Sequence, residues 1–442
     1  LSAGLVPLYK KYYEEDKEKA RLLVLSAISL SMLFSALIGF ILTSFSAEVA
    51  YFFAPGASHS AHAIASALIS ILGLATPFYV LSGMLSFLEA AHGRYNAIAW
   101  RPILLNFGSI VGAALAVYLD HVHWLATGIL ISHVAFFLWT CNQFRKLDRL
   151  WPKEKQPSHV VCKVLRRFHL GILPLMGLPL VWQVNVLTER VVSSWIGTAI
   201  IPSVDYARFI SDTTVQLIAV PLGILTMATR GGSSQKDMHE HVVSVVAAVM
   251  LMSFPIAAFI GFNAEAIVRL LFARGAFDAQ SVALTASVLR FMGGSAGMTI
   301  TAYYLVKALN AQLRNREALL FTVLACAANM AVNFSLWPYF GANTIGLGVA
   351  VYGTILLILC FSSLGLWREL IALMGWLGAG VVIQGATSVL TDSFLLYPLN
   401  LVTNAALAIV IWVSILLLAP AARMAAKPVL RRLPARNRLP FG

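Results

Sequence analysis

Twelve long apolar segments dominate this chain, and each is long enough to cross the hydrocarbon core of a membrane. A spanning helix needs about 20 mostly apolar residues. Apolar residues make up 59% of the sequence and charged residues only 12%, a balance that a water-soluble surface does not allow. Because the runs are unbroken, they exclude the alternating pattern of β-barrel strands. The sequence predicts an all-α, polytopic transmembrane helix bundle with helices near 21–45, 63–90, 99–119, 123–142, 169–196, 204–229, 241–262, 281–308, 318–337, 344–366, 371–391 and 396–418.

The placement of basic residues predicts the topology. Most lysines and arginines fall in alternate loops, whereas the other set of loops holds only Arg269 and Arg274. Short cytoplasmic loops of membrane proteins carry the excess of positive charge. We therefore expect both termini of this chain on the cytoplasmic side. The net charge of +13 is then mostly a topology signal, and no nucleic-acid partner is expected.

Two short stretches 219 positions apart are similar in sequence. Residues 53–57 and 272–276 share four of five residue types, with Pro55 in the first copy where the second has Arg274. The same offset carries the apolar run 21–45 onto another apolar run. This pattern predicts an internal repeat whose two copies run in the same direction. Two similar turns that arose by chance are the alternative.

Charged residues within the predicted spans are the candidate functional groups, because a charge inside a bilayer is costly and tends to face the bundle interior or water. Asp205, Arg208 and Asp212 are spaced by three and four residues, so they share one helix face. Glu189 and Arg190 are adjacent and point in different directions. The full set of candidates is Arg101, Glu189, Arg190, Asp205, Arg208, Asp212 and Arg290.

Several motifs, in order along the whole chain, resemble the lipid II flippase family, MurJ or MviN, of the multidrug/oligosaccharidyl-lipid/polysaccharide (MOP) flippase superfamily. The most specific is the turn that contains Arg274, Gly275, Phe277 and Asp278. The others are Val6-Pro7-Leu8 before a charged connector, Ala54-Pro55-Gly56, Pro102-Ile103-Leu104-Leu105-Asn106, Tyr206-Ala207-Arg208 and Pro221-Leu222-Gly223.

The resemblance implies a domain organisation. Members of the family have fourteen helices, in two six-helix lobes plus two C-terminal helices. Twelve segments here imply that the first helix and most of the second precede Leu1, and that the chain as given is truncated at its N-terminus. The expected parts are a remnant of the first lobe at 1–142, a basic cytoplasmic connector at 143–168, a second lobe at 169–366, and two extra helices with a basic cytoplasmic tail at 367–442.

The resemblance also implies a function. We expect a flippase of the bacterial cytoplasmic (inner) membrane that moves an undecaprenyl-pyrophosphate-linked saccharide, lipid II or an exopolysaccharide repeat unit, to the outer leaflet by alternating access. Two alternatives remain open. One is a multidrug or cation exporter of the same superfamily, and the other is a truncated relative that does not transport.

Arginine suits the pyrophosphate of such a substrate, because its planar fork donates bidentate hydrogen bonds and keeps its charge when dehydrated. We expect Arg190, Arg208 and Arg290 to bind it. Glu189, Asp205 and Asp212 are expected to hold these arginines or to take part in ion coupling. Structural ion pairs near helix ends are the alternative, and Arg101 could snorkel to the interface. Relatives carry the cavity arginine one place later in the Tyr-Ala motif, where this chain has Phe209.

The sequence favours a transporter over an enzyme. It has no Walker-type phosphate loop, and no nucleophile with an ordered base stands out. The cysteines are scattered without metal or redox spacing, at Cys141, Cys162, Cys326 and Cys360. We therefore expect no cofactor and no metal. The expected partners are a lipid-linked saccharide, the phospholipid bilayer and cell-envelope synthesis enzymes, with the protein acting as a monomer.

Overall fold

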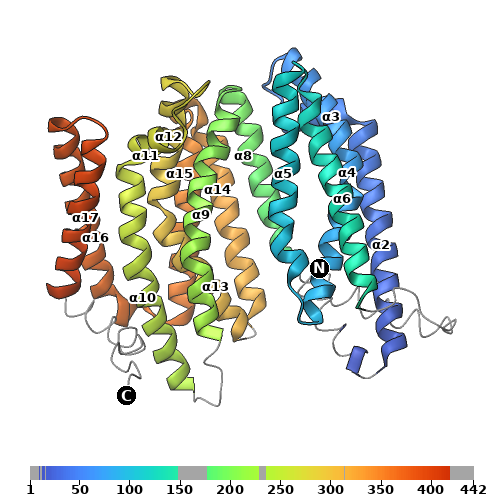
Figure 1. Cartoon of the computed structure of the whole chain (residues 1–442). Coiled ribbons are helices and arrows are strands. Elements are labelled where there is room, and N and C mark those ends of the chain that lie inside the picture. The colour runs from blue at the N-terminus through green and yellow to red at the C-terminus, as the bar shows by residue number, and fades with distance from the viewer. Residues whose placement is uncertain are drawn as a thin grey trace, which may run out of the picture. The chain divides into compact units, whose positions relative to one another are not determined.

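The computed structural model describes Tyr9 and residues 12–14, 16–147, 177–227, 235–312 and 314–418. Every regular element in these ranges is an α-helix, which confirms the all-α prediction (Figure 1). The apolar stub before Tyr9, residues 148–176 of the connector region, Cys162 within them, and the basic tail from residue 419 lie outside the described residues.

The chain divides into two compact units, Leu1–Leu180 and Val181–Gly442. In the first unit, α4 packs against both α2 and α6, and α6 also packs against α5. A short helix, α3, follows α2 and lies against α4. The helices of this unit are α2 at Lys17–Ser44, α3 at Ser46–Phe53, α4 at His59–Ala91, α5 at Asn96–Tyr118 and α6 at His123–Arg145.

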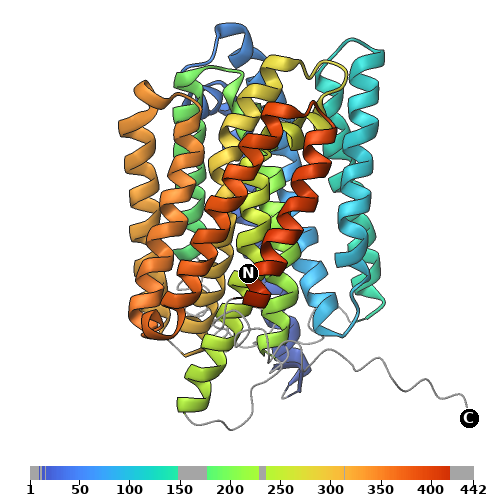
Figure 2. The same ribbon diagram turned by 90° about the vertical axis from the view of Figure 1, so that its left-hand side faces the viewer.

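The second unit contains the remaining helices, the first of which, α8, begins a few residues before the boundary at Val181. Its core forms where α10, α13, α14 and α15 pack together, and α16 joins this core through Leu370, Leu373 and Leu377. Figure 2 shows α16 and α17 side by side. The helices are α8 at Gly177–Ile196, α9 at Ile200–Met227, α10 at Gln235–Phe262, α11 at Ala264–Phe272, α12 at Ala279–Gly294, α13 at Ala296–Ala311, α14 at Asn315–Phe340, α15 at Asn343–Leu364, α16 at Trp367–Phe394 and α17 at Leu399–Leu418.

Within the described ranges, nine helices are long and apolar enough to cross a membrane. The three other predicted spans correspond to α8, α9 and the α12–α13 pair. Glu189 and Arg190 on α8, and three further charged residues on α9, lower the hydropathy of those helices. The predicted helix 281–308 is interrupted at Ser295, which ends α12 and precedes α13, so neither half reaches the length of a span.

The helix boundaries reproduce the internal repeat. When 219 is added to the bounds of α2, α3, α5 and α6, the results differ by at most three residues from the bounds of α10, α11, α14 and α15. The bounds of α4 shift to 278 and 310, and the α12–α13 pair runs from 279 to 311. Pro77 of α4 shifts to position 296, next to the Ser295 break. The second copy therefore breaks next to the position where the first copy has a proline inside a continuous helix, which lacks a backbone N–H for the helical ladder.

Glycines bring α5 and α6 of the first unit into backbone contact. A Cβ built on Gly112 would lie 2.8 Å from the carbonyl oxygen of Trp124, and one built on Gly128 would meet the backbone of both Gly108 and Gly112. Small residues four apart, such as Gly108 and Gly112, allow this approach in membrane helices. Close packing of α5 against α6 therefore depends on the absence of side chains at these positions.

Glycines serve the same purpose in the second unit. A Cβ on Gly261 of α10 would lie 2.8 Å from the Cα of Gly294, and one on Gly297 would touch Phe254 at 3.0 Å. α10 therefore packs closely against the segment in which the chain breaks at Ser295.

Replacing Gly128 with Ala is expected to lower the free energy of unfolding by about 1–3 kcal/mol, because the new Cβ overpacks a backbone contact. Gly378→Ala is the matched control, since a Cβ there meets no atom within 4 Å. That control should be neutral or stabilising by up to about 1 kcal/mol. Thermal unfolding of the detergent-solubilised protein measures both variants. Equal effects would contradict the packing role of Gly128.

Candidate functional site

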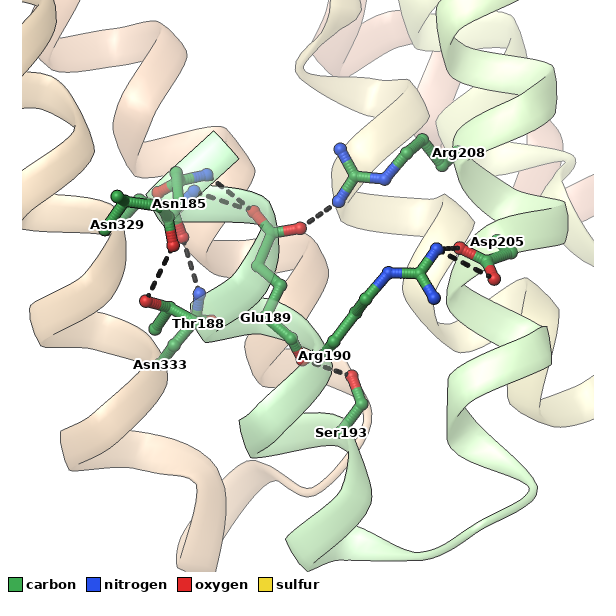
Figure 3. Close-up of polar contacts among 10 residues, drawn as sticks. Asn185, Thr188, Glu189, Arg190, Ser193, Asp205, Arg208, Asn329 and Asn333 are labelled. Carbon is green, nitrogen blue, oxygen red and sulfur yellow. Dashed lines mark hydrogen bonds and ion pairs between the residues drawn. The ribbon is translucent and has the colours of Figure 1, made fainter. Parts of the chain in front are cut away.

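A buried carboxylate lies on α8 of the second unit. Glu189 is only 1% exposed. Its Oε1 accepts hydrogen bonds from Asn185 Nδ2 at 2.9 Å and from Asn329 Nδ2 at 3.0 Å, and its Oε2 accepts one from Arg208 (Figure 3). Burial of a charge is tolerated when it is both paired and hydrogen-bonded. Glu189 meets both conditions, and it thereby joins α8, α9 and α14.

The neighbouring side chain, Arg190, points elsewhere and has its own partner. Its Nη2 donates to the two carboxylate oxygens of Asp205 on α9, at 3.1 and 3.4 Å (Figure 3). The two side chains are 43% and 49% exposed. The prediction that Glu189 and Arg190 do not neutralise each other is therefore confirmed. Two separate ion pairs link α8 to α9, one buried and one exposed.

The other candidates of this unit are less constrained. Asp212 lies one turn after Arg208 on α9 and is exposed. Arg290 on α12 is also exposed, and its guanidinium has no hydrogen bond or ion pair with any residue that the structure describes. Arg190, Arg208 and their partner acids thus come together, whereas no contact joins Arg290 to them within the described part of the chain.

Sequence reasoning missed three asparagines that complete the buried cluster. Asn333 Nδ2 donates to Asn329 Oδ1 at 2.7 Å, and Asn329 in turn donates to Glu189. The Oδ1 atoms of Asn185 and Asn333 are buried without a partner in the described ranges. The pairs 185/189 and 329/333 are each spaced by four residues on apolar helices. This repeated spacing of polar groups was the available signal, because it places both members on one helix face.

The turn that carries the family motif has a structural basis. Gly275 adopts a φ of 62°, a left-handed conformation that glycine reaches without strain. Asp278 caps α12 by accepting a hydrogen bond from the Ser281 backbone N–H at 2.8 Å, and this bond lowers the pKa of its carboxyl group. The Phe277 ring lies 5.2 Å from Tyr206 of α9. Exposed Arg274 donates to the Leu271 carbonyl oxygen at 2.6 Å.

An apolar groove lies in the same unit between α10 and α17. Its volume is about 560 Å³. The α17 helix is anchored at one end by Asn404, whose Nδ2 donates to Asn263 Oδ1 at 2.7 Å and which also bonds to Thr391 of α16. The groove is lined by Ala248, Leu251, Met252, Pro255, Ile256, Phe259, Ala405, Ala408, Ile409, Trp412, Val413 and Leu416.

Two solved structures of membrane proteins have a similar arrangement of helices. A lipid II flippase MurJ in an inward closed conformation superposes with a TM-score of 0.79 over 97% of this chain and 88% of that chain, at 16% identity. An inward-facing multidrug resistance MATE family transporter of the MOP superfamily superposes with a TM-score of 0.62 over 82% of this chain and 84% of the other, at 13% identity. The chain therefore shares its fold, a polytopic helical bundle, with these two proteins.

The sequence narrows this class to one family. The sequence profile described as lipid II flippase MurJ matches residues 1–424. A probable lipid II flippase MurJ of Thermotoga maritima is 25% identical over 354 residues, which cover 79% of this chain and 71% of that protein. The chain belongs to the lipid II flippase MurJ family. It is a transporter-family protein and not an enzyme.

The two ion pairs are expected to differ sharply in their contribution to stability. Arg208→Ala leaves Glu189 buried without its cation and should lower the free energy of unfolding by about 3–5 kcal/mol. Asp205→Ala breaks an exposed pair and should cost at most about 1 kcal/mol. Thermal or chemical unfolding in detergent measures the difference. A double variant, Glu189→Gln with Arg208→Gln, should recover most of the loss, and similar losses for the two single variants would contradict the assignment.

Proposed function

We propose that this protein is a flippase that moves an undecaprenyl-pyrophosphate-linked saccharide from the inner to the outer leaflet of the bacterial cytoplasmic membrane by alternating access. The match to the MurJ family over residues 1–424 supports this class of substrate. The observation that carries the proposal is the arrangement of arginines on α8 and α9, where one is held by a buried acid and the other by an exposed one.

In this proposal, the pyrophosphate binds Arg190 by displacing Asp205. An exposed ion pair contributes little net stability, because water and salt screen it. A pyrophosphate offers several charged oxygens at once, so it competes well for the planar donor fork of Arg190. The released Asp205 then faces the substrate or an accompanying cation. Exchange of partners at the exposed pair provides reversible binding, which a translocation cycle requires.

Arg208 has a different role in the proposed site, because its position is set by Glu189. The buried carboxylate holds one guanidinium nitrogen and leaves other N–H groups of the 16% exposed side chain free for a ligand. Arg290 adds a cation without a protein partner among the described residues. Glu189 is thus an arginine-holding residue, while Asp205 and Asp212 are exposed enough to exchange ions.

The groove between α10 and α17 is the proposed place for part of the polyprenyl tail. Its lining is almost entirely apolar, and its only indole N–H, on Trp412, is already bonded to Gln384 at 2.7 Å. A tail in this groove needs no polar partner, whereas the pyrophosphate requires the arginines. The driving force in this proposal is an ion gradient or the membrane potential, which acts on the charged headgroup with about 2.3 kcal/mol per charge per 100 mV.

Arg190→Ala is expected to abolish leaflet translocation of the lipid-linked saccharide, because the headgroup loses its exchangeable cation. Insertion into the membrane should be unchanged, since the Arg190–Asp205 pair is exposed. The measurement is transfer of a labelled lipid-linked saccharide in proteoliposomes that contain the full chain. The role of Arg208 is tested with the double variant Glu189→Gln with Arg208→Gln, which is expected to keep most of the stability. This variant should also lose translocation, because it lacks the Arg208 guanidinium.

Arg269→Ala is the matched control for Arg190→Ala. Arg269 also forms an exposed ion pair, with Glu265 at 3.0 Å, but it lies on α11 outside the proposed site. We expect this variant to translocate at about the wild-type rate. Normal translocation by both Arg190→Ala and the Arg208 double variant would overturn the proposed site.

Lipid II and an exopolysaccharide unit share the undecaprenyl pyrophosphate, so the arginines do not discriminate between them. Depletion of the protein in the bacterium that produces it distinguishes between the two substrates. Loss of lipid II transport stops cell-wall synthesis and is expected to cause lysis. Loss of an exopolysaccharide unit instead removes a surface polymer from intact cells. We favour the lipid II outcome because of the family match, and lysis scored by microscopy would support it.

A further inference from the structure

One cationic side chain of the first unit is not among the residues of the site described above. Arg101 lies on α5, five residues after the helix begins at Asn96. Its guanidinium has no hydrogen bond or ion pair with any residue that the structure describes, and its contact is with the ring of Tyr79 on α4, whose centroid is 4.8 Å away. A charge within a membrane-spanning helix normally has a partner or lines a path for ions or substrate.

The side chain of Arg101 points into the bundle. One loop joins the end of α4 to the start of α5, so depth along both helices can be counted from that loop. With a rise of 1.5 Å per residue, the Cα of Arg101 lies about 8 Å from the start of α5. Tyr79 lies about 18 Å from the end of α4. The guanidinium lies deeper than its own Cα, because a Cβ on Gly83, about 12 Å from the same end of α4, would lie 3.1 Å from its Nη1. It is thus directed away from the α4–α5 loop, opposite to the direction that snorkelling requires.

Two aromatic side chains complete the surroundings of this guanidinium. Tyr79 is 50% exposed, and its ring lies 5.5 Å from the ring of His133 on α6. His133 Nδ1–H donates to the Ile129 carbonyl oxygen at 2.7 Å, which leaves Nε2 without a partner in the described part of the chain. The hydroxyl group of Tyr79 has no such partner either. Three unsatisfied polar groups from α4, α5 and α6 therefore lie close together.

We propose that Arg101, Tyr79 and His133 form an anion-binding site within the first unit, and that its ligand is the phosphate group of a lipid. The Tyr79 ring holds the guanidinium by a cation–π contact and leaves its five N–H donors free for a bidentate phosphate contact. Gly83 provides the space in which the guanidinium lies. The choice of a lipid phosphate rests on the proposed function, whereas the anion site rests only on this geometry.

The ligand has two possible sources, the headgroup of a phospholipid and the pyrophosphate of a polyprenyl carrier. The test is native mass spectrometry of the full chain in detergent, with phosphatidylglycerol and geranylgeranyl pyrophosphate titrated separately. Arg101→Gln is expected to weaken the binding of at least one ligand by about tenfold or more. Arg101→Lys should recover only part of it, because lysine lacks the planar fork.

Arg94→Gln is the matched control, since it removes one positive charge from the exposed loop between α4 and α5. It should change the affinity less than about twofold, as expected for an exposed and screened charge. Tyr79→Phe keeps the ring and should retain most of the affinity, whereas Gly83→Ala displaces the guanidinium and should weaken binding with Arg101 still present. Thermal unfolding of each variant verifies that it is folded.

A loss confined to geranylgeranyl pyrophosphate identifies the carrier as the ligand, and a loss confined to phosphatidylglycerol identifies a phospholipid. The site is refuted if Arg101→Gln binds both ligands as well as Arg94→Gln does, or if the wild-type chain binds neither. Failure of the proposed function has a different signature. In that case the wild-type protein does not translocate lipid-linked saccharide, although its lipid binding still depends on Arg101.

Discussion

Burial of the Glu189 carboxylate is the constraint on which the second unit depends. A carboxylate that is 1% exposed needs hydrogen-bond donors from its surroundings, because no water replaces them. Those donors come from Asn185 one turn earlier, from Arg208 on α9 and from Asn329 on α14. The positions of three helices are therefore coupled through one side chain. The exposed pair of Arg190 and Asp205 sits beside this cluster and can change partners without disturbing it.

The two copies of the internal repeat share helix boundaries but use different chemistry to pack. In the first copy, α5 and α6 approach through Gly108, Gly112 and Gly128. In the second copy, Asn329 and Asn333 of α14 correspond by the 219-residue offset to Ile110 and Ala114 of α5. Asn329 connects α14 to Glu189 of α8, and an apolar residue stands at the equivalent position of α5. The two copies therefore share helix positions but differ in the polar side chains that they carry.

Arg190 and Arg208 of the second unit and Arg101 of the first unit have different environments. In the second unit, Arg190 and Arg208 each face an acid, so their charge is available only through exchange or at free N–H groups. In the first unit, Arg101 faces the ring of Tyr79, which attracts a cation without neutralising it. An aromatic partner leaves the full positive charge for an anion, whereas an acid must first be displaced.

The sequence by itself determined the class of fold, the positions of the helices and the duplication, because apolar runs of membrane length and a constant offset are local properties of the chain. It also indicated that Glu189 and Arg190 have separate partners, since adjacent residues on a helix point in different directions.

Only the tertiary structure decided which side chains are those partners. Asn329 is 140 positions from Glu189, and no spacing rule connects them. The direction of Arg101 was likewise decided by packing, because the gap at Gly83 and the Tyr79 ring belong to another helix. Partner choice across helices depends on which faces meet, and that is a property of the assembled bundle.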